Sequence, residues 1–82
     1  MTARNINGHP NQIIVVIDGT RYFFSYGVCI AKTECGLTYL DINNWDYSTT
    51  TGKYRNIFLN ETKKDTVKKI KSGEYKLEDL NQ

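Results

Sequence analysis

The sequence predicts a single α+β domain in which a three- or four-stranded antiparallel sheet, built as a meander, is followed by two short α-helices packed on one face. The first half of the chain contains apolar, β-branched runs separated by turn-forming dipeptides, a pattern typical of consecutive antiparallel strands. From about residue 50 the apolar side chains recur at helical spacing. With 82 residues there is room for one small core, so we expect residues 12–82 to form one domain.

Residues 1–11 are rich in turn formers and contain a single large aliphatic residue, which predicts a flexible or loosely docked N-terminal arm. The first strand is expected over Gln12–Ile17, where β-branched residues predominate. This run is apolar on both of its faces, a pattern that suits a strand with both faces at least partly covered. The Asp18-Gly19 dipeptide that follows is a strong signal for a hairpin turn.

A long second strand is expected to begin near residue 20 and to continue as far as Ala31, with Gly27 marking a bulge or a bend. One face of this strand carries large apolar side chains and the other carries small ones, where a helix or another backbone can approach closely. Lys32–Gly36 predicts a turn and Leu37–Ile42 a third strand. The pattern therefore indicates a three-stranded meander.

The segment Trp45–Tyr47 is expected either to add a short fourth strand or to cross the edge of the sheet. We interpret Trp45 and Tyr47 mainly as residues that close the core, because so short a chain needs large side chains to seal it. The alternative is that they are exposed aromatic anchors for a partner.

The first helix is predicted from Tyr54, Ile57 and Phe58, which share one helical face. The hydroxyl residues 48–51 offer N-caps, so the helix is expected to begin near residue 50, and Asn60 is a plausible end because asparagine tolerates the left-handed conformation.

A second helix is predicted over Glu61–Ser72, with Gly73 at its C-terminal end. Thr62 and Asp65 have the spacing of a capping box, and Asp65 and Lys69 have the spacing of an ion pair four residues apart. The remaining residues are expected to fold back so that three apolar side chains cover the core: Tyr75, Leu77 and Leu80.

Composition excludes several classes of protein. Nine of the ten aromatic residues lie between positions 22 and 58, which argues against disorder and places the core there. The net charge of +2 is divided unevenly, −1 over residues 1–50 and +3 over residues 51–82, which is a weak pointer toward nucleic acid. The chain lacks a signal-peptide pattern and a long apolar run, so we expect reduced cysteines at Cys29 and Cys35 and a cytoplasmic location.

The sequence contains no recognisable catalytic or cofactor motif. His9 is the only histidine, so neither a zinc cage nor a positioned nucleophile is expected. Asp41 and Asp46 both flank a turn and are interpreted as groups that cap or solvate it rather than as an acid–base pair. The dipeptide Gly52-Lys53 lacks the spacing of a phosphate-binding loop. We therefore expect no enzymatic activity, no metal and no cofactor.

The candidate partner-binding residues are the basic side chains on the flanks of the two predicted helices: Lys53, Arg55, Lys64, Lys68 and Lys71. The first alternative is that the last three bind DNA or RNA directly, where three phosphate contacts give a salt slope of roughly −2 to −3 for duplex DNA. The second is a structural or homo-oligomeric role in which an uncovered sheet edge pairs with another copy. The simplest interpretation is a solvated face.

Four parts of the chain resemble a group of short proteins encoded by tailed bacteriophages and related mobile elements: Phe24-Ser-Tyr26, Trp45–Ser48, Thr50–Arg55 with Phe58-Leu59, and Lys69–Tyr75 with Asp79-Leu80-Asn81. The resemblance extends over nearly all of the chain from about Gln12. Small phage proteins of this kind are commonly inhibitors or mimics that bind a host macromolecule, and anti-CRISPR proteins are one case. The resemblance thus implies a non-catalytic inhibitor of a host defence or nucleic-acid-processing protein or ribonucleoprotein complex.

Overall fold

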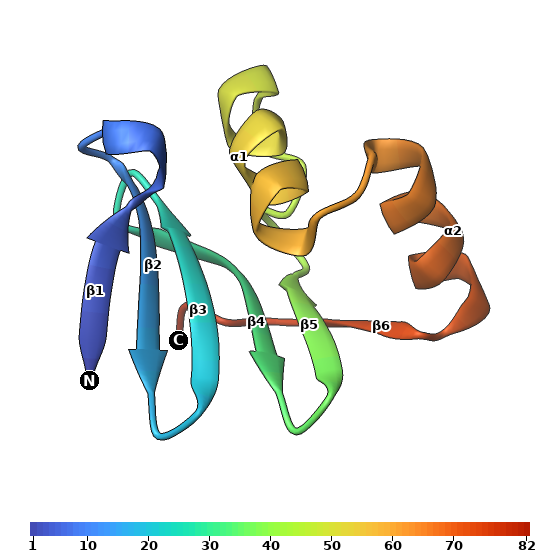
Figure 1. Ribbon diagram of the computed structural model, residues 1–82. Helices are drawn as coiled ribbons and strands as arrows, with labels where there is room; N and C mark the ends of the chain where they lie inside the picture. Colours follow the sequence, from blue (N-terminus) through green and yellow to red (C-terminus); the bar gives the residue numbers. More distant parts are fainter.

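The computed structural model describes residues 1–82 and contains a six-stranded sheet with two α-helices (Figure 1). The strands follow one another across the sheet in chain order, antiparallel except for the parallel last pair. The α+β class is confirmed, but the sheet is larger than predicted and mixed in direction. The elements are β1 (Thr2–Asn5), the 3-10 helix η1 (Ile6–Gly8), β2 (Gln12–Ile17), β3 (Thr20–Ser25), β4 (Val28–Glu34), β5 (Leu37–Asp41), α1 (Thr49–Leu59), α2 (Lys63–Ser72) and β6 (Tyr75–Glu78).

Three two-residue turns connect the four central strands. Asp18-Gly19 forms the predicted hairpin turn between β2 and β3, and Cys35-Gly36 forms the turn between β4 and β5. The turn between them, Tyr26-Gly27, divides the long second strand predicted from the sequence into β3 and β4. Both of its residues have positive φ, 52° and 80°, as a type I′ turn requires. Asn, Asp or Gly is the usual first residue of such a turn, so the tyrosine conceals this hairpin in the sequence.

The N-terminal segment is not a separate arm, which corrects the prediction for residues 1–11. β1 pairs with β2, and Ile6 in η1 is buried in the core at 5% exposure. The backbone groups along the outer edge of β2 need hydrogen-bond partners, and β1 supplies them. Residues 2–5 are thus polar in composition but form the edge strand of the sheet.

Both helices end as their sequences predict. Ser48 caps α1 by accepting a hydrogen bond from the Thr51 N–H at 3.1 Å, and Asn60 terminates that helix in the left-handed conformation with φ of 56°. Thr62 and Asp65 form both halves of the capping box of α2, and Gly73 ends it with φ of 84°. Local side-chain and backbone rules therefore account for the limits of the helical layer.

After α2 the chain returns to the sheet as β6, parallel to β5. Tyr75 is buried, as predicted, whereas Leu77 is 37% exposed. Beyond β6 the chain is held by two hydrogen-bonded contacts. The buried Asp41 carboxylate accepts from the Leu80 N–H at 2.8 Å, and the Asn81 side chain pairs with the Cys29 N–H and C=O at 2.8 and 2.9 Å. Because β5 ends before it reaches Cys29, Asn81 takes the position of a strand neighbour there.

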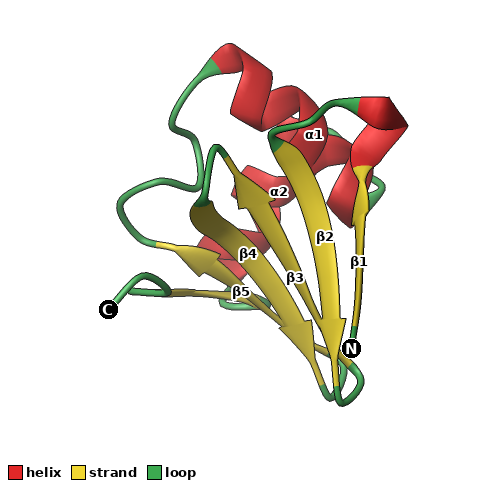
Figure 2. Ribbon diagram, turned by 90° about the vertical axis from the view of Figure 1, so that its left-hand side faces the viewer, coloured by secondary structure: helices red, strands yellow, loops and turns green.

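The core lies between the sheet and the helices, and Figure 2 shows both helices on the same side of the sheet. Phe23 on β3 is fully buried and stacks on Phe58 of α1 with 5.7 Å between the ring centroids. Ile14 and Leu40 belong to the same cluster. Their neighbours along each strand point to the opposite face, which no helix covers.

Gln12 places an amide side chain on the core side of the sheet, where it makes no hydrogen bond. The side chain is fully buried, and neither its Nε2 nor its Oε1 has a hydrogen-bond partner. A buried amide without partners has lost its hydration and gained nothing in return. We expect Gln12→Met, which keeps the shape, to raise the free energy of unfolding by about 1–3 kcal/mol in urea denaturation. Gln82→Met, at an exposed terminal position, is the control; a loss of stability on Gln12→Met would contradict this interpretation.

Candidate functional site

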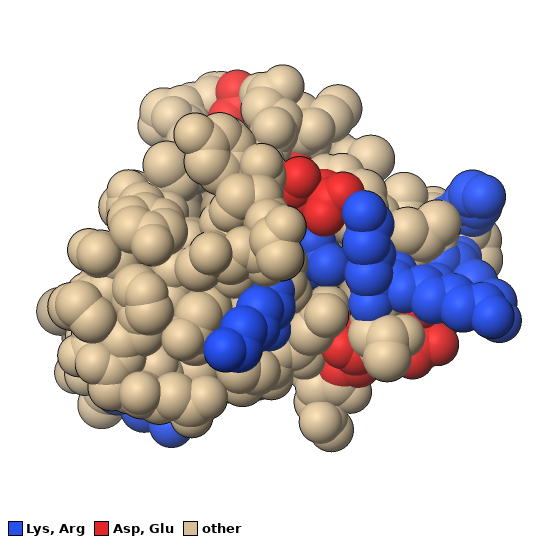
Figure 3. Space-filling view, turned by 90° about the horizontal axis from the view of Figure 1, so that it is seen from above, with Lys and Arg blue, Asp and Glu red and all other residues tan.

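The outer side of α2 carries a stripe of exposed, unpaired lysines. We call Lys64, Lys68 and Lys71 the lysine stripe; all three are exposed, and none lies within 4.0 Å of an acidic oxygen. Figure 3 shows basic side chains gathered at the end of the molecule where α2 lies, with acidic side chains beside them. The inner side of the helix is different, because Thr66 is fully buried there.

The two other lysines of α2 have structural partners. Lys63 Nζ lies 2.7 Å from Asp46, in the loop before α1, and Lys69 Nζ lies 2.7 Å from Glu61, just before α2. The predicted pair between Asp65 and Lys69 does not form. Asp65 serves the capping box instead, and Glu61, whose side chain is only 6% exposed, is a better fixed partner for Lys69.

Glu61 joins α2 to β6. Its carboxylate accepts hydrogen bonds from Lys69, from the Thr66 hydroxyl and from the Tyr75 hydroxyl, the last at 2.7 Å. Burial alone would raise the pKa of Glu61, but these hydrogen bonds outweigh it and hold the pKa below its ordinary value. Burial, reinforced by Glu61, raises the pKa of Tyr75 to about 12. Glu61 therefore stays ionised as a structural group.

Arg55, which the sequence placed among the contact residues, is not on the surface. It is 1% exposed, its guanidinium lies 5.2 Å from the Trp45 ring centroid, and it donates to the Trp45 carbonyl at 2.7 Å and to Asp46 at 3.2 Å. The buried face of α1 is made by Thr51, Gly52, Tyr54, Arg55 and Phe58, whereas Ile57 is 42% exposed. Arg55 is accordingly a core residue and is removed from the candidate binding set.

Lys53 is exposed on α1, as predicted, and makes no ion pair. Its amino group lies 5.5 Å from the Tyr54 ring centroid. With Lys63 it borders a wide, shallow depression along α1. Lys53 therefore lies on α1, apart from the lysine stripe of α2.

Asp41 and Asp46 are both hydrogen-bonded within the fold. Burial of Asp41 acts to raise its pKa, but donors led by the Leu80 N–H and the Asn44 side chain hold the pKa below its ordinary value. Burial also acts to raise the pKa of Asp46. Hydrogen bonds from Lys63 and Arg55 outweigh it, so the pKa lies below its ordinary value. Both carboxylates are engaged by groups that hold the chain together.

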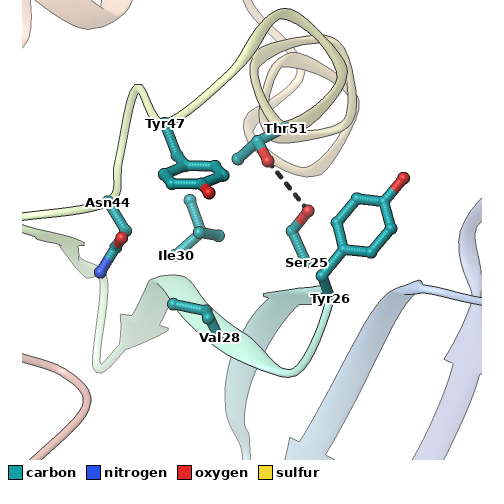
Figure 4. A pocket seen from close by; sticks show the side chains of 7 residues that line it. All are labelled: Ser25, Tyr26, Val28, Ile30, Asn44, Tyr47 and Thr51. Atoms are coloured by element: carbon teal, nitrogen blue, oxygen red, sulfur yellow. Dashed lines mark hydrogen bonds between the residues drawn. The ribbon is translucent and has the colours of Figure 1, made fainter.

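A hollow of about 270 Å³ lies beside the N-terminus of α1 (Figure 4). Tyr26 and Tyr47 stand at its rim, 55% and 72% exposed, and Val28 and Ile30 line it from β4. The exposure of Tyr47 corrects the prediction that it closes the core. Trp45 does pack against the core, as predicted, and neither it nor Tyr54 lines the hollow.

The polar groups of the hollow are neutral. Asn44 lies at the end opposite Tyr26, and the Ser25 and Thr51 hydroxyls are 3.0 Å apart in a hydrogen bond. No acidic, basic or imidazole side chain lines it. Such a lining can accept an apolar or aromatic group but offers no acid–base pair.

Comparison with protein families gives a match over most of the chain. The profile described as "Family of unknown function (DUF8033)" matches residues 2–74. The chain belongs to this family. Neither the curated proteins nor the solved structures yielded a match.

The matched part of this DUF8033 protein contains β1 to β5 and both helices, including the lysine stripe and the hollow, and it ends just before β6. No helix in the fold combines the length and apolar character needed to cross a bilayer. No three His, Cys, Asp or Glu side chains are grouped as metal ligands, and Cys29 and Cys35 are both free thiols.

Proposed function

We propose that this chain is a small, non-catalytic binding protein of phage type that inhibits a host defence or nucleic-acid-processing protein, in the manner of an anti-CRISPR protein. The lysine stripe docks on an acidic surface of that partner. The observation that carries the proposal is the division of the α2 lysines: Lys63 and Lys69 form ion pairs with Asp46 and Glu61 of the same chain, whereas the stripe is exposed and makes no ion pair.

A protein partner is favoured over bare nucleic acid by the two exposed tyrosines. Tyrosine is enriched among the residues that dominate protein–protein binding energies, because it combines a large contact area with a polar tip. Tyr26 is held at positive φ, a conformation that is costly for an aromatic residue, and its side chain is 55% exposed beside the hollow. The hollow between Tyr26 and Tyr47 receives an apolar side chain of the partner.

Affinity capture from nuclease-treated bacterial lysate tests the proposal. We expect the wild-type chain to retain one host protein in near-stoichiometric amount and to release it as salt is raised, because exposed charge pairs are screened. The triple variant Lys64→Glu, Lys68→Glu, Lys71→Glu is expected to lose it. The matched triple Lys→Arg variant keeps the charges on the same helix and is expected to retain it.

The nucleic-acid alternative gives a different result. Fluorescence anisotropy with a 20-nucleotide duplex would then show binding that weakens with salt at a log–log slope of roughly −2 to −3, lost in the Lys→Glu variant. Such binding, without a captured protein, would overturn the proposal. Capture that is equally strong with the Lys→Glu variant would exclude the stripe as the contact.

A further inference from the structure

The hollow beside the N-terminus of α1 contains a hydrogen-bond acceptor that the fold leaves unused. The Asn44 side chain donates from Nδ2 to the Asp41 carboxylate at 2.7 Å, and Figure 4 shows that nitrogen pointing away from the other residues of the hollow. Because hydrogen bonds hold the pKa of Asp41 below its ordinary value, its carboxylate is ionised at neutral pH and can only accept. The amide is thereby oriented, and Asn44 Oδ1 is left at the hollow without a donor.

The backbone holds Asn44 in place. Its N–H donates to the Asp41 carbonyl at 3.3 Å, and its carbonyl accepts from the Tyr47 N–H at 3.2 Å. The side chain is half-buried, so its oxygen is within reach of a ligand. An acceptor that is already held by the main chain and by its own amide nitrogen loses little freedom when a donor binds to it.

The buried polar groups on the other side of the hollow already have partners. The Ser25 and Thr51 hydroxyls, 3% and 1% exposed, are hydrogen-bonded to each other, and Thr51 also accepts from Ser48 at 3.2 Å. No charged side chain lines the hollow, so a charge moved from water onto Val28 and Ile30 would meet no partner to offset its lost hydration. The lining therefore favours a neutral group that carries a donor.

The rim of the hollow is aromatic, and one side of it is fixed. The Tyr26 N–H donates to the Asn11 carbonyl at 2.8 Å, and the Tyr26 ring meets the His9 ring edge to face, with 6.1 Å between the centroids. Tyr47 stands on the other side of the hollow (Figure 4). Aromatic rings pair best when offset or edge to face at about 4.5–7 Å, so a ring that enters between two tyrosines gains such contacts.

The size of the hollow suits a single side chain. Its volume of about 270 Å³ lies below the roughly 300–1,000 Å³ of pockets that enclose drug-sized ligands. Tryptophan and tyrosine are the neutral side chains that combine a large apolar ring with one N–H or O–H donor. Both are also enriched among the residues that dominate protein–protein binding energies.

We propose that the hollow is a receptor site for one tryptophan or tyrosine side chain of the partner protein. The ring lies against Val28 and Ile30 between Tyr26 and Tyr47, and its N–H or O–H donates to the Asn44 amide oxygen. This assignment rests on the proposed function, because it names the group that the inhibited protein inserts. It uses none of the lysines, so the two contacts can be tested separately.

Titration of the free chain with capped amino acids tests the site without a partner protein. N-acetyl-tryptophanamide is expected to bind with a Kd on the order of 1 mM and to shift the NMR amide signals of residues 25–30 and 44–51. Its indole N-methyl derivative lacks the donor and is expected to bind about 3- to 10-fold more weakly, because the Asn44 oxygen then stays unpaired.

A second pair of probes repeats the comparison without added bulk. N-acetyl-tyrosinamide is expected to bind more tightly than N-acetyl-phenylalaninamide, which differs only by the hydroxyl, and N-acetyl-leucinamide is expected to bind more weakly than either. Equal affinity within both donor pairs would overturn the assignment of Asn44. The absence of any shift at about 20 mM of the tryptophan derivative would overturn the site itself.

The variant Tyr26→Asn removes one wall of the hollow and suits the turn. Asparagine before glycine is a preferred composition for a type I′ turn, so this variant is expected to melt no lower than the wild type and to bind N-acetyl-tryptophanamide about 5-fold more weakly. Asp18→Asn introduces the same residue at the corresponding position of the β2–β3 turn, away from the hollow, and is expected to keep the wild-type affinity. Unchanged affinity in Tyr26→Asn would contradict the site.

Affinity capture separates this inference from the proposed function. Tyr26→Asn is expected to retain several-fold less of the host protein than the wild type, whereas Asp18→Asn is expected to retain as much. Full retention by Tyr26→Asn would overturn the role of the hollow in partner binding and leave the lysine stripe as the contact. Capture of no protein by the wild-type chain would overturn the proposed function, whereas the titration decides the aromatic site by itself.

Discussion

Replacing Arg55 with alanine is expected to lower the free energy of unfolding by about 3–4 kcal/mol. The guanidinium is buried between α1 and the loop before it, in contact with the Trp45 ring and hydrogen-bonded to the Trp45 carbonyl and to Asp46. The substitution leaves a cavity about the size of a large side chain and an unsatisfied carbonyl, and each defect costs about 1–3 kcal/mol or more. Chemical denaturation monitored by Trp45 fluorescence measures the change.

Two further variants separate the causes. Arg55→Met keeps most of the volume and is expected to lose only about 1–3 kcal/mol, the cost of the unsatisfied groups. Lys63→Ala removes the exposed partner of Asp46 and is expected to cost no more than about 1 kcal/mol. A cost below 1 kcal/mol for Arg55→Ala would return this residue to the set of surface contacts.

Removing residues 75–82 is expected to abolish cooperative folding. The deletion takes away β6 and the buried Tyr75, and burial of an aromatic side chain alone stabilises a fold by about 3–5 kcal/mol. It also deprives the buried Asp41 of the Leu80 N–H and Cys29 of its Asn81 partner. A chain of this length has a total stability of only about 4–12 kcal/mol, which these losses together exhaust. Circular dichroism and thermal denaturation report the loss.

Removal of Gln82 alone is the control. This residue is exposed and makes no hydrogen bond, so its loss is expected to change the stability by less than about 0.5 kcal/mol. A cooperative transition retained by the chain ending at residue 74, the last residue matched by the family profile, would show that β6 is dispensable.

Features that depend on neighbouring residues were predictable from the sequence. The left-handed ends at Asn60 and Gly73 and the capping box of Thr62 and Asp65 each rest on one or two residues and a backbone rule, so they are where the sequence places them. The Asp18-Gly19 turn belongs to the same group. Tyr26-Gly27 uses the same turn geometry, but its tyrosine is outside the usual composition, and the strand was predicted to continue through it.

Features that depend on tertiary pairing were not predictable. β1 and β6 have only four residues each, and each is a strand because a neighbouring strand offers free backbone groups. β1 is also polar, whereas Tyr75 and Leu77 of β6 were expected to fold back onto the core but not to form a strand. The burial of Arg55 depends on how the Trp45-Asp46 loop folds over α1, which rotates that helix so that Arg55 points in and Ile57 points out. The lysine stripe was predictable because it follows from helical spacing alone, whereas the hollow beside Tyr26 and Tyr47 is assembled from three separate segments.

Lysine acetylation, read by mass spectrometry in the free chain and in its complex with a captured partner, tests the division of the α2 lysines most directly. In the free chain the stripe is expected to react faster than Lys69, because the Glu61 contact raises the Lys69 pKa and keeps its amine protonated. In the complex Lys64, Lys68 and Lys71 are expected to become protected while Lys76 on β6 stays reactive. A partner that leaves the stripe as reactive as in the free chain, while other surfaces become protected, would contradict the account.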